Sequence, residues 1–178
     1  LRLRQNLGFA DYYFEYGKKK GWDFNPTTPE ANEGTAYYAN INLYQGPFSI
    51  SWEGSDYERF AIVPRADGVT NLNRPPSLAR EFAWTLMNRS PHNLDPNDET
   101  GSNLDIMYSD DKGWTIEASG VRLKNHEDRT LYELIFGSIE KQNVGPFRLT
   151  GGFGYQDSEG LRQFAVGEEA DNPGNGWL

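Results

Sequence analysis

The 178 residues carry 17 basic and 26 acidic side chains, and this net charge of −9 argues against a duplex nucleic-acid partner, which needs a clustered basic face. The absence of cysteine excludes disulfides and thiolate metal sites. Aromatic residues make up 14% of a chain whose mean hydropathy is −0.76, a combination that suits a β-sheet protein and not a disordered chain.

Alternation of apolar and polar residues with a period of two is the dominant signal along the chain. Residues 114–119, for example, set Trp114 and Ile116 against Thr115 and Glu117. The same pattern predicts antiparallel strands at 10–16, 35–44, 47–54, 103–108, 114–119, 131–139 and 147–155. The chain is therefore expected to be all-β, an antiparallel up-and-down meander of six or seven strands.

The connections between these strands alternate in length. Tight turns are predicted at Gln45-Gly46, at 110–113 and at 143–146, each with the glycine that a hairpin favours. The longer links are expected at 17–34, 55–102 and 124–130. Up-and-down barrels of the outer membrane show this asymmetry, with short turns on the periplasmic side and longer extracellular loops.

One segment of the long loop 55–102 departs from the strand pattern. After Pro75-Pro76, apolar residues recur with helical spacing, which predicts a helix at about 77–88 that begins near Ser77. Its apolar positions are Leu78, Ala79, Phe82, Ala83, Leu86 and Met87. The helix either packs as an ordinary element of a long loop or forms a plug or gate folded against a barrel mouth.

A sheet with one apolar and one polar face needs an apolar partner on one side. In a transmembrane β-barrel that partner is lipid, and in a β-sandwich it is a second sheet. The barrel predicts a lipid-facing band formed by Ile41, Leu43, Ile50, Ile106, Ile116 and Leu134. The sandwich buries these same side chains, and a secreted sandwich could bind glycans through Trp22, Trp52, Trp84 and Trp114.

Aromatic residues gather beside the predicted tight turns. Rings at a common height are typical of the girdle at a membrane interface, although strand propensity alone also favours aromatics. The predicted membrane-interface aromatics are Tyr44, Phe48, Tyr108, Trp114 and Phe147.

The residues that could carry chemistry are few. The two histidines, His92 and His126, lie in polar stretches without a second histidine at ligand spacing, so both are expected to be solvated. The acidic cluster at 95–99 lacks the glycine of a calcium-binding EF-hand and is interpreted as a solvated loop. A glycosidase would need two facing carboxylates, and the candidates are Glu53, Glu117 and Glu133.

The stretch Asn73-Arg74-Pro75-Pro76-Ser77-Leu78-Ala79-Arg80, continuing through Leu86-Met87-Asn88-Arg89-Ser90-Pro91 to Gly101, resembles a known family. That family is a large, uncharacterised outer-membrane β-barrel family of Gram-negative bacteria, and the resemblance covers roughly residues 35–156. It implies an outer-membrane location and no established reaction. Because members of the family are considerably longer, it also implies that the chain is only part of a barrel.

Taken together, these features predict a single β domain over 1–178, or a fragment of a larger barrel, located in the cell outer membrane. The expected function is that of a pore, a transport component or a structural subunit of an envelope assembly. The alternative is a secreted glycan-binding β-sandwich. We predict no enzyme activity, catalytic residues, cofactor or metal. The expected partner is the lipid bilayer, with other envelope proteins as a further candidate, and the sequence does not specify a small-molecule ligand.

Overall fold

The structure is a computed structural model of the whole chain. It describes residues 1–20, 33–60, 76–79, 92, 94–95, 97–158 and 161–171, the last of these ranges by its backbone alone.

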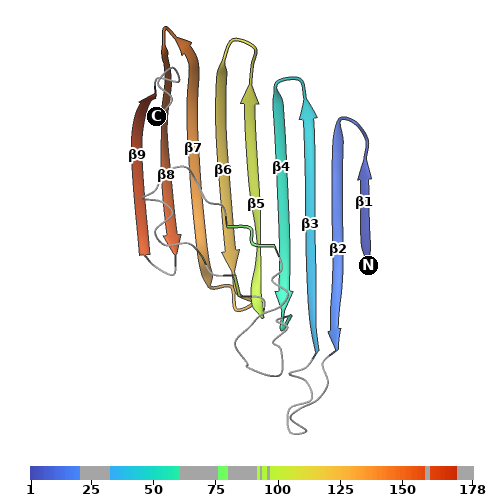
Figure 1. Cartoon of the computed structure of the whole chain (residues 1–178). Coiled ribbons are helices and arrows are strands. Elements are labelled where there is room, and N and C mark those ends of the chain that lie inside the picture. The colour runs from blue at the N-terminus through green and yellow to red at the C-terminus, as the bar shows by residue number, and fades with distance from the viewer. Residues whose placement is uncertain are drawn as a thin grey trace, which may run out of the picture.

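The described residues form one antiparallel sheet of nine strands, in which each strand pairs with its neighbours in the sequence (Figure 1). The strands are β1 (Arg2–Asn6), β2 (Ala10–Lys20), β3 (Glu33–Gln45), β4 (Phe48–Glu58), β5 (Asp98–Ser109), β6 (Trp114–Lys124), β7 (Thr130–Val144), β8 (Phe147–Ser158) and β9 (Leu161–Asp171). The predicted all-β, antiparallel up-and-down meander is confirmed, and its seven strands correspond to β2–β8. Strands β1 and β9 were not predicted.

The strands are longer than the sequence pattern indicated. The predicted link 17–34 is too long, because β2 continues to Lys20 and pairs there with Glu33 of β3. The predicted link 55–102 is also too long, because Glu58 of β4 pairs with Asp98 of β5. Polar and glycine residues at these strand ends hide the alternation that marks the strand centres.

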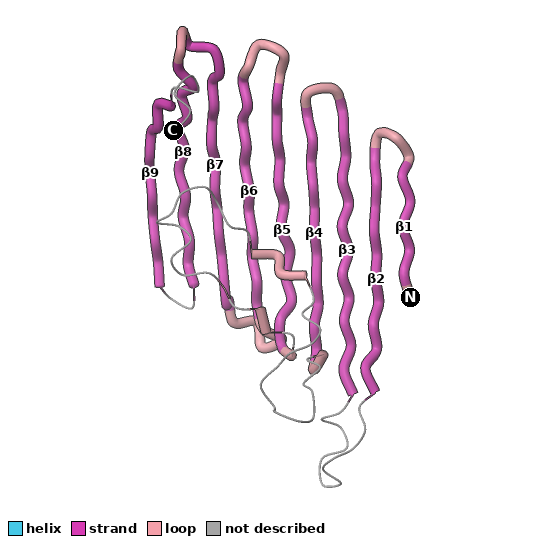
Figure 2. Tube along the Cα trace, in the orientation of Figure 1, coloured by secondary structure: helices cyan, strands magenta, loops and turns pink. Residues whose placement is uncertain are grey.

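The turns β1–β2, β3–β4, β5–β6 and β7–β8 lie along one edge of the sheet (Figures 1 and 2). The other edge carries the long connections β2–β3 and β4–β5, together with the shorter connections β6–β7 and β8–β9. Gly46 and Gly113 adopt φ angles of +57° and +80° in the predicted tight turns, a region that glycine enters without strain. In the second turn, the carboxylate of Asp110 accepts hydrogen bonds from the backbone N–H groups of Lys112 and Trp114, at 3.0 and 2.9 Å. We call the edge with the four short turns the turn edge, and the edge with the long connections the loop edge.

The sheet is open in the part of the chain that the structure describes. Strands β1 and β9 are its two outermost strands and do not pair with each other. The arrangement is therefore a meander that is compatible with closure into a barrel and with packing against another sheet.

The described residues contain no helix. Of the helix predicted at about 77–88, only 77–79 are described, and they have no regular secondary structure; the remainder lies outside the described residues. The described part of the chain has no helix long and apolar enough to cross a membrane.

Candidate functional site

One face of the sheet, which we call the apolar face, exposes large hydrophobic side chains across several strands. Cross-strand pairing places them side by side, because Ile50 pairs with Leu43 on one flank and with Ile106 on the other. Residues exposed on this face include Ile41, Leu43, Phe48, Ile50, Trp52, Leu104, Ile106, Trp114, Ile116, Ile135, Ile139, Leu149 and Phe153. Within the described residues, no second sheet covers this face.

Two aromatic rings on the apolar face lie against glycines. The indole of Trp52 occupies the space where a Cβ on Gly54 would sit, at 2.7 Å, and the ring of Phe153 does the same at Gly137. A side chain at either glycine would push the ring away from the sheet. These glycines therefore allow the aromatic rings to pack closely against the backbone of the sheet.

The five predicted interface aromatics divide between the two faces. Phe48, Tyr108, Trp114 and Phe147 lie on the apolar face near the turn edge, and the rings of Phe48 and Tyr108 are 4.9 Å apart. Tyr44 lies on the opposite face, where its hydroxyl donates a 3.1 Å hydrogen bond to Asp11.

The predicted lipid-facing band needs one correction. Five of its six members are exposed on the apolar face, but Leu134 is buried on the other face, where its side chain is only 1% exposed. Its neighbour Ile135 takes the place in the band. The prediction was wrong because β7 carries apolar residues at both parities, so alternation alone could not choose between them.

The opposite face, which we call the polar face, carries side-chain hydrogen bonds both between neighbouring strands and within β5. Asn42 donates to Asp11 at 2.9 Å, and Asp105 accepts hydrogen bonds from Asn103 at 2.8 Å and from Ser119 at 2.5 Å. Buried and half-buried polar groups are retained in a sheet when they find such partners. These side chains form a polar surface and not an apolar core.

Towards the loop edge, the polar face changes character and buries an apolar cluster. Leu78, from the long loop, is fully buried there and brings Ala79 into contact with the same cluster. The buried members of the cluster are Leu78, Val121, Leu123, Tyr132, Leu134 and Phe136. Residues 76–79 of the long connection between β4 and β5 are therefore anchored on the polar face, and Figure 1 shows them in front of β5 and β6.

Two polar contacts hold the same loop. The hydroxyl of Tyr57, a buried residue of β4, donates a 3.0 Å hydrogen bond to the carbonyl oxygen of Pro76. On β5, the fully buried Glu99 accepts a 3.1 Å hydrogen bond from the backbone N–H of Asp95 and lies 2.7 Å from Nε2 of His92. We call Tyr57, Leu78, His92 and Glu99 the loop anchor.

The prediction that His92 is solvated was wrong. Its imidazole is buried between the carboxylate of Glu99 and the ring of Tyr132, whose centroid is 5.5 Å from that of the histidine. Because β5 extends to Asp98, Glu99 belongs to the strand, and its side chain lies on the polar face like that of Asn103 four residues later. The odd-numbered position of Glu99 would have predicted this face, but only if β5 had been known to begin before residue 103.

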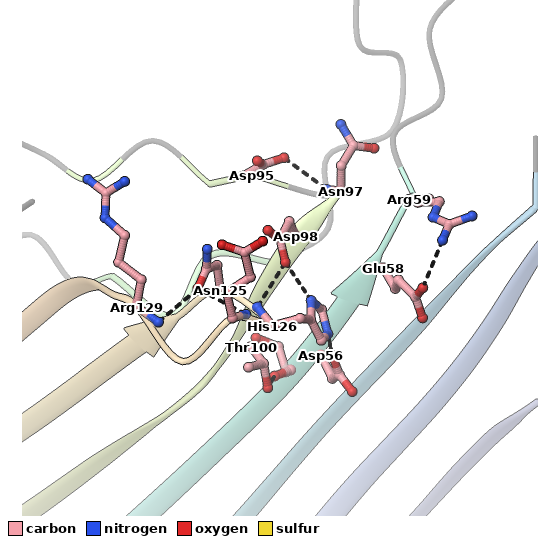
Figure 3. A network of polar contacts seen from close by, with 12 residues as sticks. Asp56, Glu58, Arg59, Asp95, Asn97, Asp98, Thr100, Asn125, His126 and Arg129 are labelled. Atoms are coloured by element: carbon pink, nitrogen blue, oxygen red, sulfur yellow. Dashed lines mark hydrogen bonds and ion pairs between the residues drawn. The ribbon is translucent and has the colours of Figure 1, made fainter. Parts of the chain in front are cut away.

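The second histidine belongs to a network at the loop edge, outside the apolar band (Figure 3). Nδ1 of His126 lies 2.6 Å from Asp98, and Nε2 lies 2.8 Å from Asp56. The backbone N–H of His126 also donates to Asp98, at 2.9 Å. Only the protonated imidazolium donates at both ring nitrogens, so the hydrogen bond to Asp98, followed by that to Asp56, raises the pKa of His126. His126 is an exposed loop residue, as predicted, but its two carboxylate partners were not foreseen.

The residues considered for chemistry diverge in the fold. Within the acidic cluster 95–99, Asp98 binds His126 whereas Glu99 is buried on the polar face. No group of three or more potential metal ligands from His, Cys, Asp and Glu occurs among the described residues. Of the glycosidase candidates, Glu53 and Glu117 lie on the polar face and Glu133 on the apolar face, where it pairs with Arg122.

The geometry defines an antiparallel meander with an exposed apolar face, a polar face and a long loop anchored on the latter. The chain belongs to DUF6029, a family of unknown function, which matches residues 1–131. The match includes β1–β6, most of the apolar band and all four residues of the loop anchor. No curated protein and no solved structure matches the chain. The description of the family names no activity, and it leaves the resemblance to outer-membrane barrels as a prediction.

Proposed function

We propose that this chain forms the wall, or part of the wall, of a β-barrel in a bacterial outer membrane, with its apolar face towards lipid and its polar face towards a hydrated interior. The observation that carries the proposal is the continuous exposed apolar band opposite the polar face. In water such a band is an unusually large patch for a monomer, whereas in a bilayer it is the surface that lipid requires.

The dimensions of the sheet support a spanning role. Strands β2 to β9 are each 11 to 15 residues long, and a tilted spanning strand needs about 9–11 residues. On β3, outward residues from Tyr37 to Leu43 extend the apolar band over about 20 Å at ~3.3 Å per residue. The apolar belt of outer-membrane barrels is about 25 Å tall.

The connections support the same orientation. Four short turns lie at the turn edge and the two long connections at the loop edge. On β3 to β7, the charged residues of the apolar face other than Lys141 lie towards the loop edge. Outer-membrane barrels place short turns in the periplasm and long loops outside the cell. The turn edge is accordingly proposed to face the periplasm.

The anchored loop gives the proposed barrel a narrowed interior. Pro76–Ala79 and His92 lie against the polar face and not above the loop edge. A loop held in this way reduces the cross-section through which a solute could pass. This favours a pore or transport component over a purely structural subunit.

Lipid would also impose a requirement on the open edges. Unpaired backbone groups of β1 and β9 are costly in a bilayer, so each edge needs a strand partner. Direct pairing of β1 with β9 would be parallel, because odd-numbered strands of a meander run in the same direction. Since bacterial barrels close with an even number of strands, we propose that at least one further strand completes the wall.

The rival function is a secreted glycan-binding sandwich. It needs a partner sheet over the apolar face and rings that project towards a sugar. Trp52 instead lies over Gly54, and the aliphatic residues around it, Ile41 and Leu104, are not sugar-stacking groups. No observation on the described residues favours the sandwich specifically.

The proposal is tested by fractionating cells that produce the protein, washing the membranes with alkaline carbonate and comparing heated with unheated samples on a gel. We expect retention in the membrane and a mobility shift on heating, which is characteristic of a folded barrel. Release into the soluble fraction would end the membrane proposal, and a glycan-binding screen would follow.

A further inference from the structure

The charged residues on the polar face of the central strands are all acidic. Among the described side chains of β3 to β7, this face carries no lysine or arginine. Its charged members are Glu53, Glu99, Asp105, Glu117 and Glu140. The basic residues of the same strands, among them Arg122 and Lys141, lie on the apolar face.

These carboxylates follow one another from level to level along the sheet. Met107, two residues beyond Asp105, pairs with Glu117, and Thr115, two residues from Glu117, pairs with Glu140. Residues two apart on a strand lie about 6.6 Å apart along it. In the half of the polar face nearer the turn edge, each successive row of cross-strand pairs therefore contains a carboxylate. We call each row of pairs a level.

This file of carboxylates continues in the other direction, towards the loop edge. Glu53 pairs with Asn103, one level above Asp105. Glu99 lies two levels higher again, and only the level of Gly101 between them has no acidic residue. The carboxylates thus run from the loop anchor to the turn edge.

Three buried side-chain oxygen atoms on this part of the polar face have no hydrogen-bond partner among the described residues: Oγ of Ser55 and two acceptor oxygens, of Asn103 and of Glu99. The side-chain amide of Asn103 donates to Asp105, which leaves its carbonyl oxygen Oδ1 unpartnered. Oε1 of Glu99 is likewise unpartnered, although Oε2 of the same carboxylate binds Asp95 and His92. Both atoms are acceptors in fully buried side chains, and a buried acceptor is stabilised by a cation or by a donor.

Resting on the proposed barrel function, we propose that the polar face of β3–β7 is a cation-conducting wall, along which positively charged solutes pass from one carboxylate to the next. Files of Asp and Glu side chains attract cations and repel anions, and several sites of moderate affinity allow an ion to leave as well as to enter. The side-chain amide of Asn103 and the hydroxyl of Ser119 hold the Asp105 carboxylate in place on this face through the hydrogen bonds that they donate to it.

The test measures ion selectivity of the full protein, purified from membranes and inserted into a planar bilayer of uncharged lipids between unequal KCl solutions. We expect a reversal potential whose sign reports K⁺ as the more permeant ion. A potential of opposite sign, or none, would overturn cation conduction. Folded, heat-modifiable protein that inserts but conducts no current would overturn the conduction proposal and leave the barrel standing.

Variants locate the selectivity on the polar face. Glu117→Gln and Asp105→Asn should each shift the reversal potential towards zero, and Glu133→Gln, the same change on the apolar face of β7, should leave it unchanged. Glu117→Gln is measured separately because loss of the hydrogen bonds at Asp105 can also affect folding, which the heat-modifiability gel reports for every variant. Equal shifts in Glu133→Gln and Glu117→Gln would refute the assignment to this face.

Discussion

Leu134 and Ile135 are neighbours in β7, yet their surroundings differ completely. Leu134 is 1% exposed beneath the anchored loop, whereas Ile135 is 47% exposed on the apolar face. Both are branched aliphatic residues, so hydropathy does not explain the difference. The strand parity does, because one side of the sheet meets the chain's own loop and the other meets whatever lies outside the sheet.

The comparison extends to the whole sheet. The polar face combines a buried apolar cluster near the loop edge with a hydrogen-bonded, acidic region below it. The apolar face is exposed throughout its band and, apart from Lys141 near the turn edge, carries its charged residues towards the loop edge, where Asp56 and Asp98 bind His126. One sheet thus presents surfaces suited to two different surroundings.

The largest expected contrast is between truncations of the two neighbours. Leu134→Ala removes a side chain packed against Leu78 and Leu123 and should lower the free energy of unfolding by about 2–5 kcal/mol. Ile135→Ala removes a half-exposed side chain and should cost about 1 kcal/mol or less. Denaturant unfolding of the purified protein measures both. Equal costs would contradict the assignment of the faces.

The next contrast introduces charge on adjacent residues of β6. Ile116→Arg places a cation in the proposed lipid-facing band and should destabilise the protein. The cost is about 2–4 kcal/mol at a bilayer midplane and smaller towards the turn edge, where Ile116 pairs with Tyr108. Glu117→Arg makes a similar change on the polar face and should leave assembly intact. The readout is the fraction of heat-modifiable protein in washed membranes. Normal assembly of Ile116→Arg would show that this side chain does not face lipid.

A smaller effect is expected at the loop anchor. Tyr57→Phe removes the hydrogen bond to the carbonyl of Pro76 and should reduce stability by about 0.5–1.5 kcal/mol. Tyr12→Phe, which removes the exposed hydrogen bond to Gln5, serves as the matched control and should have less effect. Limited proteolysis of the long loop, alongside denaturant unfolding, measures the change. Protection of the loop that is unchanged in Tyr57→Phe would argue that the contact does not hold it.

The faces of a strand could be predicted from the sequence only where its two sides contact surroundings of different polarity. In β6, Trp114 and Ile116 alternate with polar residues, so both the strand and its faces were predictable. In β7, the polar face lies beneath the loop and is apolar itself, so Leu134 and Ile135 gave conflicting signals. Local alternation reports a face only when the two sides differ in polarity.

The loop anchor was beyond sequence reasoning for a related reason. Leu78 meets Leu123 across 45 positions of the chain, and nothing in either local pattern indicates the partner. His92 and Glu99 are only seven residues apart, but their contact requires β5 to begin at Asp98, before the alternation becomes visible. Contacts made by a returning loop depend on the whole sheet and carry no periodic signal.

The smallest effect is a pH dependence at the loop edge. Because Asp98 and then Asp56 raise the pKa of His126, its contribution to stability is full below the ordinary value of about 6.5 and is lost as the pH rises through the elevated folded pKa. The chain has only 2 histidines, so NMR of labelled imidazoles follows His126 directly, with His92→Gln used for assignment. Asp98→Asn should lower the measured pKa more than Asp56→Asn, since the hydrogen bond to Asp98 is the stronger influence. An imidazole of His126 that titrates below 6.5 would contradict the network. Its loss at alkaline pH should loosen the turn between β6 and β7 without changing ion selectivity, because the network lies on the apolar side of the sheet.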